Sequence, residues 1–179
     1  VLTAIEYLQL KAFARIDGLW VALLWIFSFL FYLLGLSRPT YGMMAMLMAL
    51  ATPFVLGFLL RKFRNGVLDG VISFGRGWGY SVLTCFYASL LFGLSVYAYF
   101  TFLDQGYLFD ALAQMLQRAD MAPVLKQGNL DTLLTDSLQQ MKTMRPIDLA
   151  LNMMFSCLMI GMLLALPIAA LLQKAVRTT

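Results

Sequence analysis

The stretch YSVLTCFYASLLFGLSVYAYFTFL, residues 80–103, contains no charged side chain and is dominated by aromatic and aliphatic residues. A helix needs about 20 apolar residues to cross the hydrocarbon core of a bilayer, and this stretch is long enough. In lipid, only helices and closed barrels satisfy every backbone hydrogen bond, and the residues here lack the apolar–polar alternation of a barrel strand. The stretch therefore predicts a membrane-spanning helix.

Three further stretches have the same character. Residues 18–37 and 41–60 carry no charge, and residues 147–172 carry only Asp148, near one end. The chain is 61% hydrophobic and 12% charged, whereas soluble domains are about 25% charged. We predict an all-α integral membrane four-helix bundle, with the basic, glycine-rich loop 61–79 between the second and third spans. These spans exclude soluble functions such as nucleic-acid binding.

Basic residues gather on one side of the predicted spans. They are Lys11, Arg15, Arg61, Lys62, Arg64, Arg76, Lys174 and Arg177, whereas the short turn on the other side has Arg38 and the loop 104–146 mixes both signs. Cytoplasmic loops of membrane proteins are enriched in Lys and Arg. We therefore expect a multi-pass protein of the bacterial inner membrane, with the N-terminus and the C-terminal tail 173–179 in the cytoplasm.

The segments outside the spans are also expected to be helical. Residues 1–17 place apolar side chains on one arc and Lys11 and Arg15 across from it, which predicts either an amphipathic helix in the inner interface or an extension of the first span. The extracytoplasmic segment 104–146 has two amphipathic halves, separated by Pro123 and Gly128. It predicts a helical hairpin that caps the outer end of the bundle or lies on the outer surface.

Small residues at four-residue spacing let helices approach closely in lipid. The second and fourth spans carry such series: Ala45, Ala49, Pro53 and Gly57, and then Gly161, Ala165 and Ala169. We therefore expect these two spans to be the closest neighbours, and the first and third spans to present more bulk to lipid or to another subunit. Pro53 and Pro167 are expected to kink the same two helices.

The segment GVISFGRGWGYSVL, residues 70–83, gathers glycines around Arg76. It lacks the spacing of a P-loop or a dinucleotide fingerprint, and no strand is predicted, which argues against a nucleotide site. The four-residue spacing within each of two glycine pairs favours close helix contact: Gly66 with Gly70, and Gly75 with Gly79. We call Arg61, Lys62, Arg64, Arg76 and Trp78 the basic collar. It predicts either general anchoring to anionic phospholipid or a specific contact with one phosphate.

The same segment carries a family resemblance. The chain combines this segment with a tight first hairpin, a polar outer segment and a last span ending LPIAALLQK. In this combination it resembles the bacterial membrane-protein family called domain of unknown function 4199, common in Bacteroidetes. The most specific part is Ile72-Ser73-Phe74-Gly75 followed by Gly79, and the resemblance runs from Leu19 over most of the chain. It implies a four-helix inner-membrane protein with no established activity and no transferable catalytic residues. It also suggests a membrane-associated partner such as a glycosyltransferase.

Groups suited to catalysis are scarce in the sequence. The chain has no histidine, and its two cysteines lie in apolar runs. Arg38, Asp104, Arg145 and Asp148 are expected at the outer rim, where each acid faces Arg38 or Arg145, and a structural rim pair is favoured over a proton or cation site. We predict no catalytic residue, no metal site and no cofactor. The methionines of the second and fourth spans indicate adaptable packing rather than a copper path.

These observations favour a non-catalytic accessory or scaffold subunit. It would bind a protein partner at the membrane through the basic collar, the N-terminal helix, or the first and third spans. The alternative is transport or binding of a lipid or a lipid-linked sugar phosphate, with the basic collar gathering the phosphate. An intramembrane enzyme is the third possibility.

Overall fold

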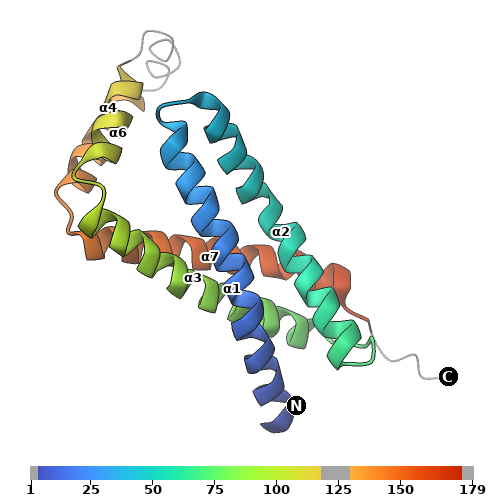
Figure 1. Cartoon of the computed structure of the whole chain (residues 1–179). Helices are drawn as coiled ribbons and strands as arrows, with labels where there is room; N and C mark the ends of the chain where they lie inside the picture. The colour runs from blue at the N-terminus through green and yellow to red at the C-terminus, as the bar shows by residue number, and fades with distance from the viewer. Residues whose placement is uncertain (1–3, 118–129, 175–179) are drawn as a thin grey trace.

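The computed structural model describes residues 4–117 and 130–174. In these ranges the chain forms α1 (Ala4–Gly35), α2 (Pro39–Val67), α3 (Phe74–Phe102), α4 (Tyr107–Leu116), α6 (Leu130–Lys142) and α7 (Pro146–Leu172) (Figure 1). The helices α1, α2, α3 and α7 are long and apolar enough to cross a membrane, which confirms the all-α prediction with four candidate spans. The predicted break at Pro123 and Gly128, and Arg177 in the tail, lie outside the described residues.

The four long helices follow one another in space in the order α2, α1, α3, α7. α1 packs extensively against both α2 and α3, and α3 packs extensively against both α1 and α7. α2 and α7, at the two ends of this row, share a much smaller contact, where Gly57 of α2 lies against Ile168 and Leu172 of α7. Figure 1 shows the two helices diverging from that point.

The prediction that the second and fourth spans are the closest neighbours is therefore wrong. The small side chains of Ala45 and Ala49 face a space between α2 and α7 instead of bringing the two helices together. The third span was expected to present more bulk to lipid or to another subunit than the second and fourth spans, but α3 is the most buried of the four, although Leu94 and Phe102 are exposed on it. α1 does expose large side chains, including Trp20 and Phe27.

Glycines make the closest helix approaches, but at positions that differ from most of those predicted. A Cβ atom on Gly18 of α1 would lie 2.9 Å from the Thr84 carbonyl oxygen of α3. A Cβ on Gly161 of α7 would lie 2.8 Å from Cys85 of α3, and one on Gly93 of α3 would lie 3.0 Å from Met154 of α7. These contacts explain why α3 packs tightly on both sides.

The predicted glycine pairs of the 61–79 region do not make such contacts. No described atom lies within 4 Å of a Cβ placed on Gly66, Gly70, Gly75 or Gly79. Gly70 has a φ of +82°, which L side chains rarely adopt, so this glycine serves the turn between α2 and α3. Gly77 is the member of the segment with neighbours, since a Cβ placed on it would lie in ordinary contact, 3.6–3.7 Å, with side chains of Leu60, Ala169 and Ile72.

The N-terminal segment is continuous with the first span. α1 runs without a break from Ala4 to Gly35, so the described part of segment 1–17 is an extension of the first span's helix and not a separate helix. Leu10 and Ala14 are buried in this part of α1, and Phe13 contacts the ring of Phe63 on α2. Tyr7 and Leu8 remain exposed.

The bundle has two distinct ends. We call the end that carries the α2–α3 connection and Lys174 the basic end, because the basic collar lies there. At this end Ile72 and Lys174 form an isolated antiparallel bridge, with N···O distances of 3.1 and 2.9 Å. The opposite end, where α4 and α6 lie near the α1–α2 turn, is called the α4–α6 end (Figure 1).

Candidate functional site

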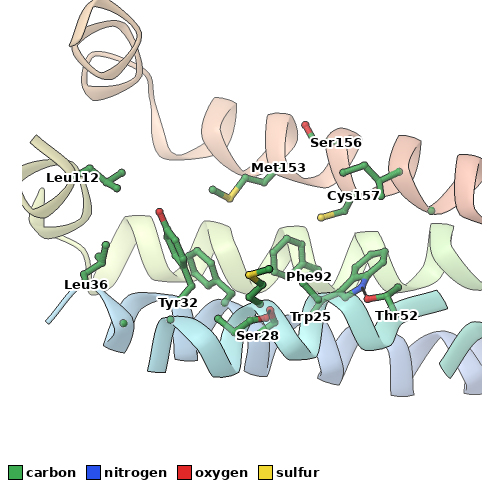
Figure 2. A pocket seen from close by; sticks show the side chains of 18 of the residues that line it. Trp25, Ser28, Tyr32, Leu36, Thr52, Phe92, Leu112, Met153, Ser156 and Cys157 are labelled. Carbon is green, nitrogen blue, oxygen red and sulfur yellow. Dashed lines mark hydrogen bonds between the residues drawn. The ribbon is translucent and has the colours of Figure 1, made fainter. Parts of the chain in front are cut away.

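A large apolar cavity lies between the diverging helices α2 and α7. Its volume is about 790 Å³, within the range of about 300–1,000 Å³ typical of small-molecule sites. α1, α2, α3, α4 and α7 all contribute to its wall. Figure 2 shows side chains of α7 facing those of α1 and α2 across the open space. We call this space the apolar cavity.

Aromatic rings from α1 and α3 form one wall of the apolar cavity. The Phe92 ring of α3 packs edge-on against Trp25 and Phe29 of α1, with centroids 6.1 and 6.0 Å apart. Phe29 in turn contacts Tyr99 at 5.4 Å. Such edge-to-face pairs add to the energy of burial and hold the rings at fixed angles. This wall is therefore rigid, and it joins α1 to α3.

The α2 side of the apolar cavity is held to α1 by hydrogen bonds. Trp25 Nε1 donates to Thr52 Oγ1 at 3.2 Å, and Ser28 Oγ donates to the Ala45 carbonyl at 2.9 Å. Because Ala45 and Ala49 have small side chains, the helix surface between these bonds stays hollow. The small residues of α2 thus shape the cavity.

The α7 side supplies flexible and weakly polar side chains. Met153 and Cys157 point toward the space from α7, whereas Ser156 points to the opposite side of this helix, and Leu112 of α4 closes the far end of the space (Figure 2). Thioether side chains adapt their shape to an apolar ligand. The wall as a whole is apolar, with a few hydroxyl groups, one of which belongs to Tyr32. The cavity can therefore bind an apolar molecule through complementary shape and burial of apolar surface.

A second cavity of about 800 Å³ adjoins the first at the α4–α6 end. Leu36 and Ser37, in the α1–α2 turn, line both spaces. The remaining wall of this polar cavity comes from the α3–α4 connection and α4, with Leu103, Asp104, Gln105, Tyr107, Asp110, Ala111 and Gln114. The Ser37 and Tyr107 hydroxyls share a hydrogen bond of 2.8 Å at the boundary.

Asp104 organises the connection between α3 and α4. It is 4% exposed, and its Oδ1 accepts hydrogen bonds from the Tyr99 hydroxyl at 2.8 Å and the Leu108 amide at 3.0 Å. Its Oδ2 accepts a third bond from the Gly106 amide at 3.2 Å. A buried carboxylate with three donors is satisfied where it is. Asp104 therefore fixes the wall of the polar cavity.

The other predicted rim residues behave differently from Asp104. Arg145 donates two hydrogen bonds to the Asp148 carboxylate, from Nε at 2.8 Å and from Nη2 at 3.0 Å. These hydrogen bonds and the negative charge of Asp148 raise the pKa of Arg145. Arg38 is exposed and makes no ion pair with a described acid. Asp110 of α4 pairs with Lys142 of α6 at 2.7 Å, which links the two short helices. Of the predicted Asp–Arg contacts, the Arg145–Asp148 contact is present and the Arg38–Asp104 contact is absent.

The basic collar lies away from both cavities. None of Arg61, Lys62, Arg64, Arg76 and Trp78 lines either one. Arg64 donates from Nη1 to the Leu172 carbonyl at 2.9 Å, so it caps the last turn of α7. Arg61 and Lys62 are exposed, while Arg76 and Trp78 are half-buried in the first turns of α3.

A family model described as "Protein of unknown function (DUF4199)" matches residues 17–174. The chain belongs to the DUF4199 family. This confirms the resemblance drawn from segment 70–83. No curated protein and no solved structure matches the chain. The DUF4199 match begins at Asp17 and ends at Lys174, so it includes every residue that lines the two cavities.

Sequence reasoning missed two features of the structure, the apolar cavity and a buried hydrogen-bonded pair at the basic end. Asp17 was assigned to the segment before the first span, yet it is 4% exposed and accepts a hydrogen bond from the Tyr80 hydroxyl of α3. The signal for such a pair was an acid directly before Gly18, the glycine that α3 approaches. The apolar cavity had no signal of its own, because a small residue that faces a cavity and one that faces a helix look alike in sequence.

Proposed function

We propose that this protein is a non-catalytic accessory subunit of the bacterial inner membrane, with both termini in the cytoplasm, and that it binds a membrane lipid in the apolar cavity. The observation that carries the proposal is the apolar cavity itself, which is lined by four membrane-length helices and by α4, and whose wall consists mainly of apolar side chains. A space of this kind within hydrocarbon depth is filled by lipid chains in preference to water, because its wall offers few hydrogen-bond partners.

The position of the cavity's entrance, on the side of the bundle between α2 and α7, supports a lipid as the ligand. Met46 of α2 and Ile160 of α7 line the cavity and are also among the exposed large hydrophobic residues. In a bilayer these exposed faces contact lipid tails, so a chain can enter from the side between α2 and α7 without crossing water. Burial of apolar surface alone provides little driving force in hydrocarbon. Shape and the hydroxyl groups in the wall would therefore select the lipid.

The position of the basic collar argues for a separate task. The collar lies at the basic end, whereas the apolar cavity extends to the α1–α2 turn and α4. A lipid phosphate held by Arg61 and Lys62 would therefore not belong to the lipid in the cavity. We assign the collar to anchoring the basic end on anionic phospholipid, where each basic residue near the surface contributes about 1 kcal/mol.

Filling the cavity tests the lipid proposal. Ala49→Trp places an indole in the apolar cavity, while Ala170→Trp places one on an exposed position of α7 outside its wall. The protein is purified in mild detergent, and bound lipids are counted by native mass spectrometry. We expect wild type and Ala170→Trp to retain lipid and Ala49→Trp to lose most of it. Equal lipid retention in all three proteins would refute lipid binding at this site.

A second candidate function, docking of a protein partner, is favoured by the start of α1. Tyr7, Leu8 and Ile16 are exposed there, and Figure 1 shows the N-terminal turns of α1 extending beyond the neighbouring helices. An exposed apolar strip beside the basic collar suits a membrane-associated partner, such as a glycosyltransferase. Co-purification from the native membrane, compared between wild type and Leu8→Gln with Ile16→Gln, tests it. A partner retained equally by both proteins would place the docking surface elsewhere.

A further inference from the structure

The apolar cavity and the polar cavity together match the two parts of a lipid, its apolar chains and its polar headgroup. Leu36 and Ser37 line both, so the polar cavity begins where the apolar cavity ends. α4 lies between them: Leu112 and Met115 belong to the apolar wall, while Asp110 and Gln114 belong to the polar wall. A lipid whose chain lies between α2 and α7 would therefore place its headgroup beside α4.

The boundary between the compartments offers hydrogen bonds. In the Ser37–Tyr107 pair one hydroxyl donates to the other, which leaves one O–H donor and several acceptor lone pairs unused. Tyr32 adds a further hydroxyl on the apolar side, and Figure 2 shows it pointing into the space from α1. These groups can contact the ester or ether oxygens that join a lipid's chains to its headgroup.

The charge of the polar cavity selects among headgroups. Of the described residues, the ionisable side chains in its wall are acids and tyrosine, with no Arg or Lys among them. Asp104 is satisfied by its three donors, and Asp110 is paired with Lys142. A phosphate monoester or diester placed here would lie beside Asp104 and Asp110, with no Arg or Lys in the described wall to bind it, which is unfavourable. This contrasts with the basic collar at the opposite end.

The remaining polar groups suit hydroxyls. Gln105 and Gln114 each present an amide that can donate and accept, and carboxylate oxygens accept from O–H donors. We infer that the lipid bound by this protein has an uncharged, hydroxyl-rich headgroup, which lies in the polar cavity beside α4. This inference rests on the lipid-binding function proposed above and adds the chemical class of the lipid and the end at which its headgroup lies.

A competition among lipids with identical chains tests the inference. The full-length protein is reconstituted into vesicles that contain equal amounts of dioleoyl phosphatidylglycerol, dioleoyl phosphatidylethanolamine and dioleoyl glucosyl diacylglycerol. It is then extracted in mild detergent, and the retained lipids are quantified by mass spectrometry. We expect the glucosyl lipid to be enriched about tenfold over phosphatidylglycerol, as a net gain of one or two hydrogen bonds would give. Equal retention of the three lipids, or enrichment of either phospholipid, overturns the inference.

Variants of residues in the polar cavity test whether the preference for the glucosyl lipid arises there. Gln114→Ala removes one amide from the wall and should lower the enrichment about threefold to tenfold, the value of one hydrogen bond. Gln114→Lys should shift the retained lipid toward phosphatidylglycerol. Gln140→Ala, on the exposed surface of α6, is the matched control and should change nothing. An enrichment that Gln114→Ala leaves intact overturns the placement of the headgroup.

The Ala49→Trp variant separates the two levels of the proposal. If it abolishes retention of all three lipids while wild type shows no preference for the glucosyl lipid, the lipid-binding function stands and the headgroup inference fails. If it leaves every lipid at the wild-type level, the apolar cavity does not hold lipid and both fail.

Discussion

The carboxylate of Asp17 on α1 accepts a hydrogen bond from the hydroxyl of Tyr80 on α3, and both side chains are buried. The Tyr80 ring stacks on Phe63 of α2, with centroids 4.4 Å apart and planes within 5° of parallel. One cluster therefore joins three helices at the basic end. An ionisable group buried between membrane helices is costly unless it is partnered, so this pair should matter for stability.

Removing the Tyr80 hydroxyl should cost more than neutralising its partner. Tyr80→Phe leaves the Asp17 carboxylate buried without its hydrogen bond, at a cost of about 1–3 kcal/mol. Asp17→Asn keeps an acceptor oxygen and should cost less than about 1 kcal/mol. Unfolding in mixed micelles with increasing SDS measures both. The double variant Asp17→Leu with Tyr80→Phe should be more stable than Tyr80→Phe alone, and the reverse order would show that the pair is not the cause.

Two glycines of the spans should respond oppositely to alanine. In Gly161→Ala the new Cβ meets Cys85 at 2.8 Å, so α3 and α7 must move apart, at a cost of about 1–3 kcal/mol. In Gly79→Ala the Cβ meets no described atom, and alanine favours the helix by about 0.5–1 kcal/mol over glycine. The same SDS titration should rank Gly79→Ala at or above wild type. Equal destabilisation by both would contradict the contacts described for α3.

The residues of the basic collar should divide into structural and exposed members. Arg64→Gln removes the hydrogen bond to the Leu172 carbonyl and should destabilise the fold by about 0.5–1.5 kcal/mol. Arg61→Gln removes the same charge from an exposed position and should leave the unfolding midpoint unchanged. The same SDS titration gives both unfolding midpoints. An unfolding midpoint that falls equally in both variants would argue against the Arg64 cap.

Of the two rim aspartates, the buried Asp104 should contribute to stability and the exposed Asp148 should not. Asp104→Asn turns an amide NH₂ toward the Gly106 amide and should destabilise the α3–α4 connection by about 1–3 kcal/mol. Asp148→Asn affects an exposed ion pair with Arg145 and should have no measurable effect on unfolding. Limited proteolysis between α3 and α4 gives a local readout, with faster cleavage expected only in Asp104→Asn. Faster cleavage in Asp148→Asn as well would count against this division.

The four spans could be predicted because the free energy of burying a helix in lipid depends on local composition. Residues 80–103 and 41–60 have no charge, and no tertiary contact is needed to place them in a membrane. The family could also be identified, since its most specific sequence features are local to segment 70–83. The partners of each helix could not be predicted in this way. Packing depends on which face of a helix meets which, and Ala45 is equally compatible with a neighbour and with a cavity.

The buried pair at the basic end shows a second limit. Asp17 was placed outside the first span because a charged residue ordinarily ends an apolar run. Its hydrogen-bond partner is distant in sequence, and only the close approach of α3 at Gly18 brings the two together. Likewise, Gly66 and Gly79 satisfied the small-residue pattern but face no neighbour. A spacing rule describes what a helix permits, while the fold determines which of those positions are used.

The location of the two cysteines allows occupancy of the apolar cavity to be measured on the native chain. Cys157 lines the apolar cavity, whereas Cys85 is fully buried between α3 and α7. An apolar thiol reagent can therefore reach Cys157 through the cavity and is excluded from Cys85. The rate at which such a reagent alkylates the unmodified protein reads out directly how much of the cavity is occupied, in the native membrane and without any engineered label.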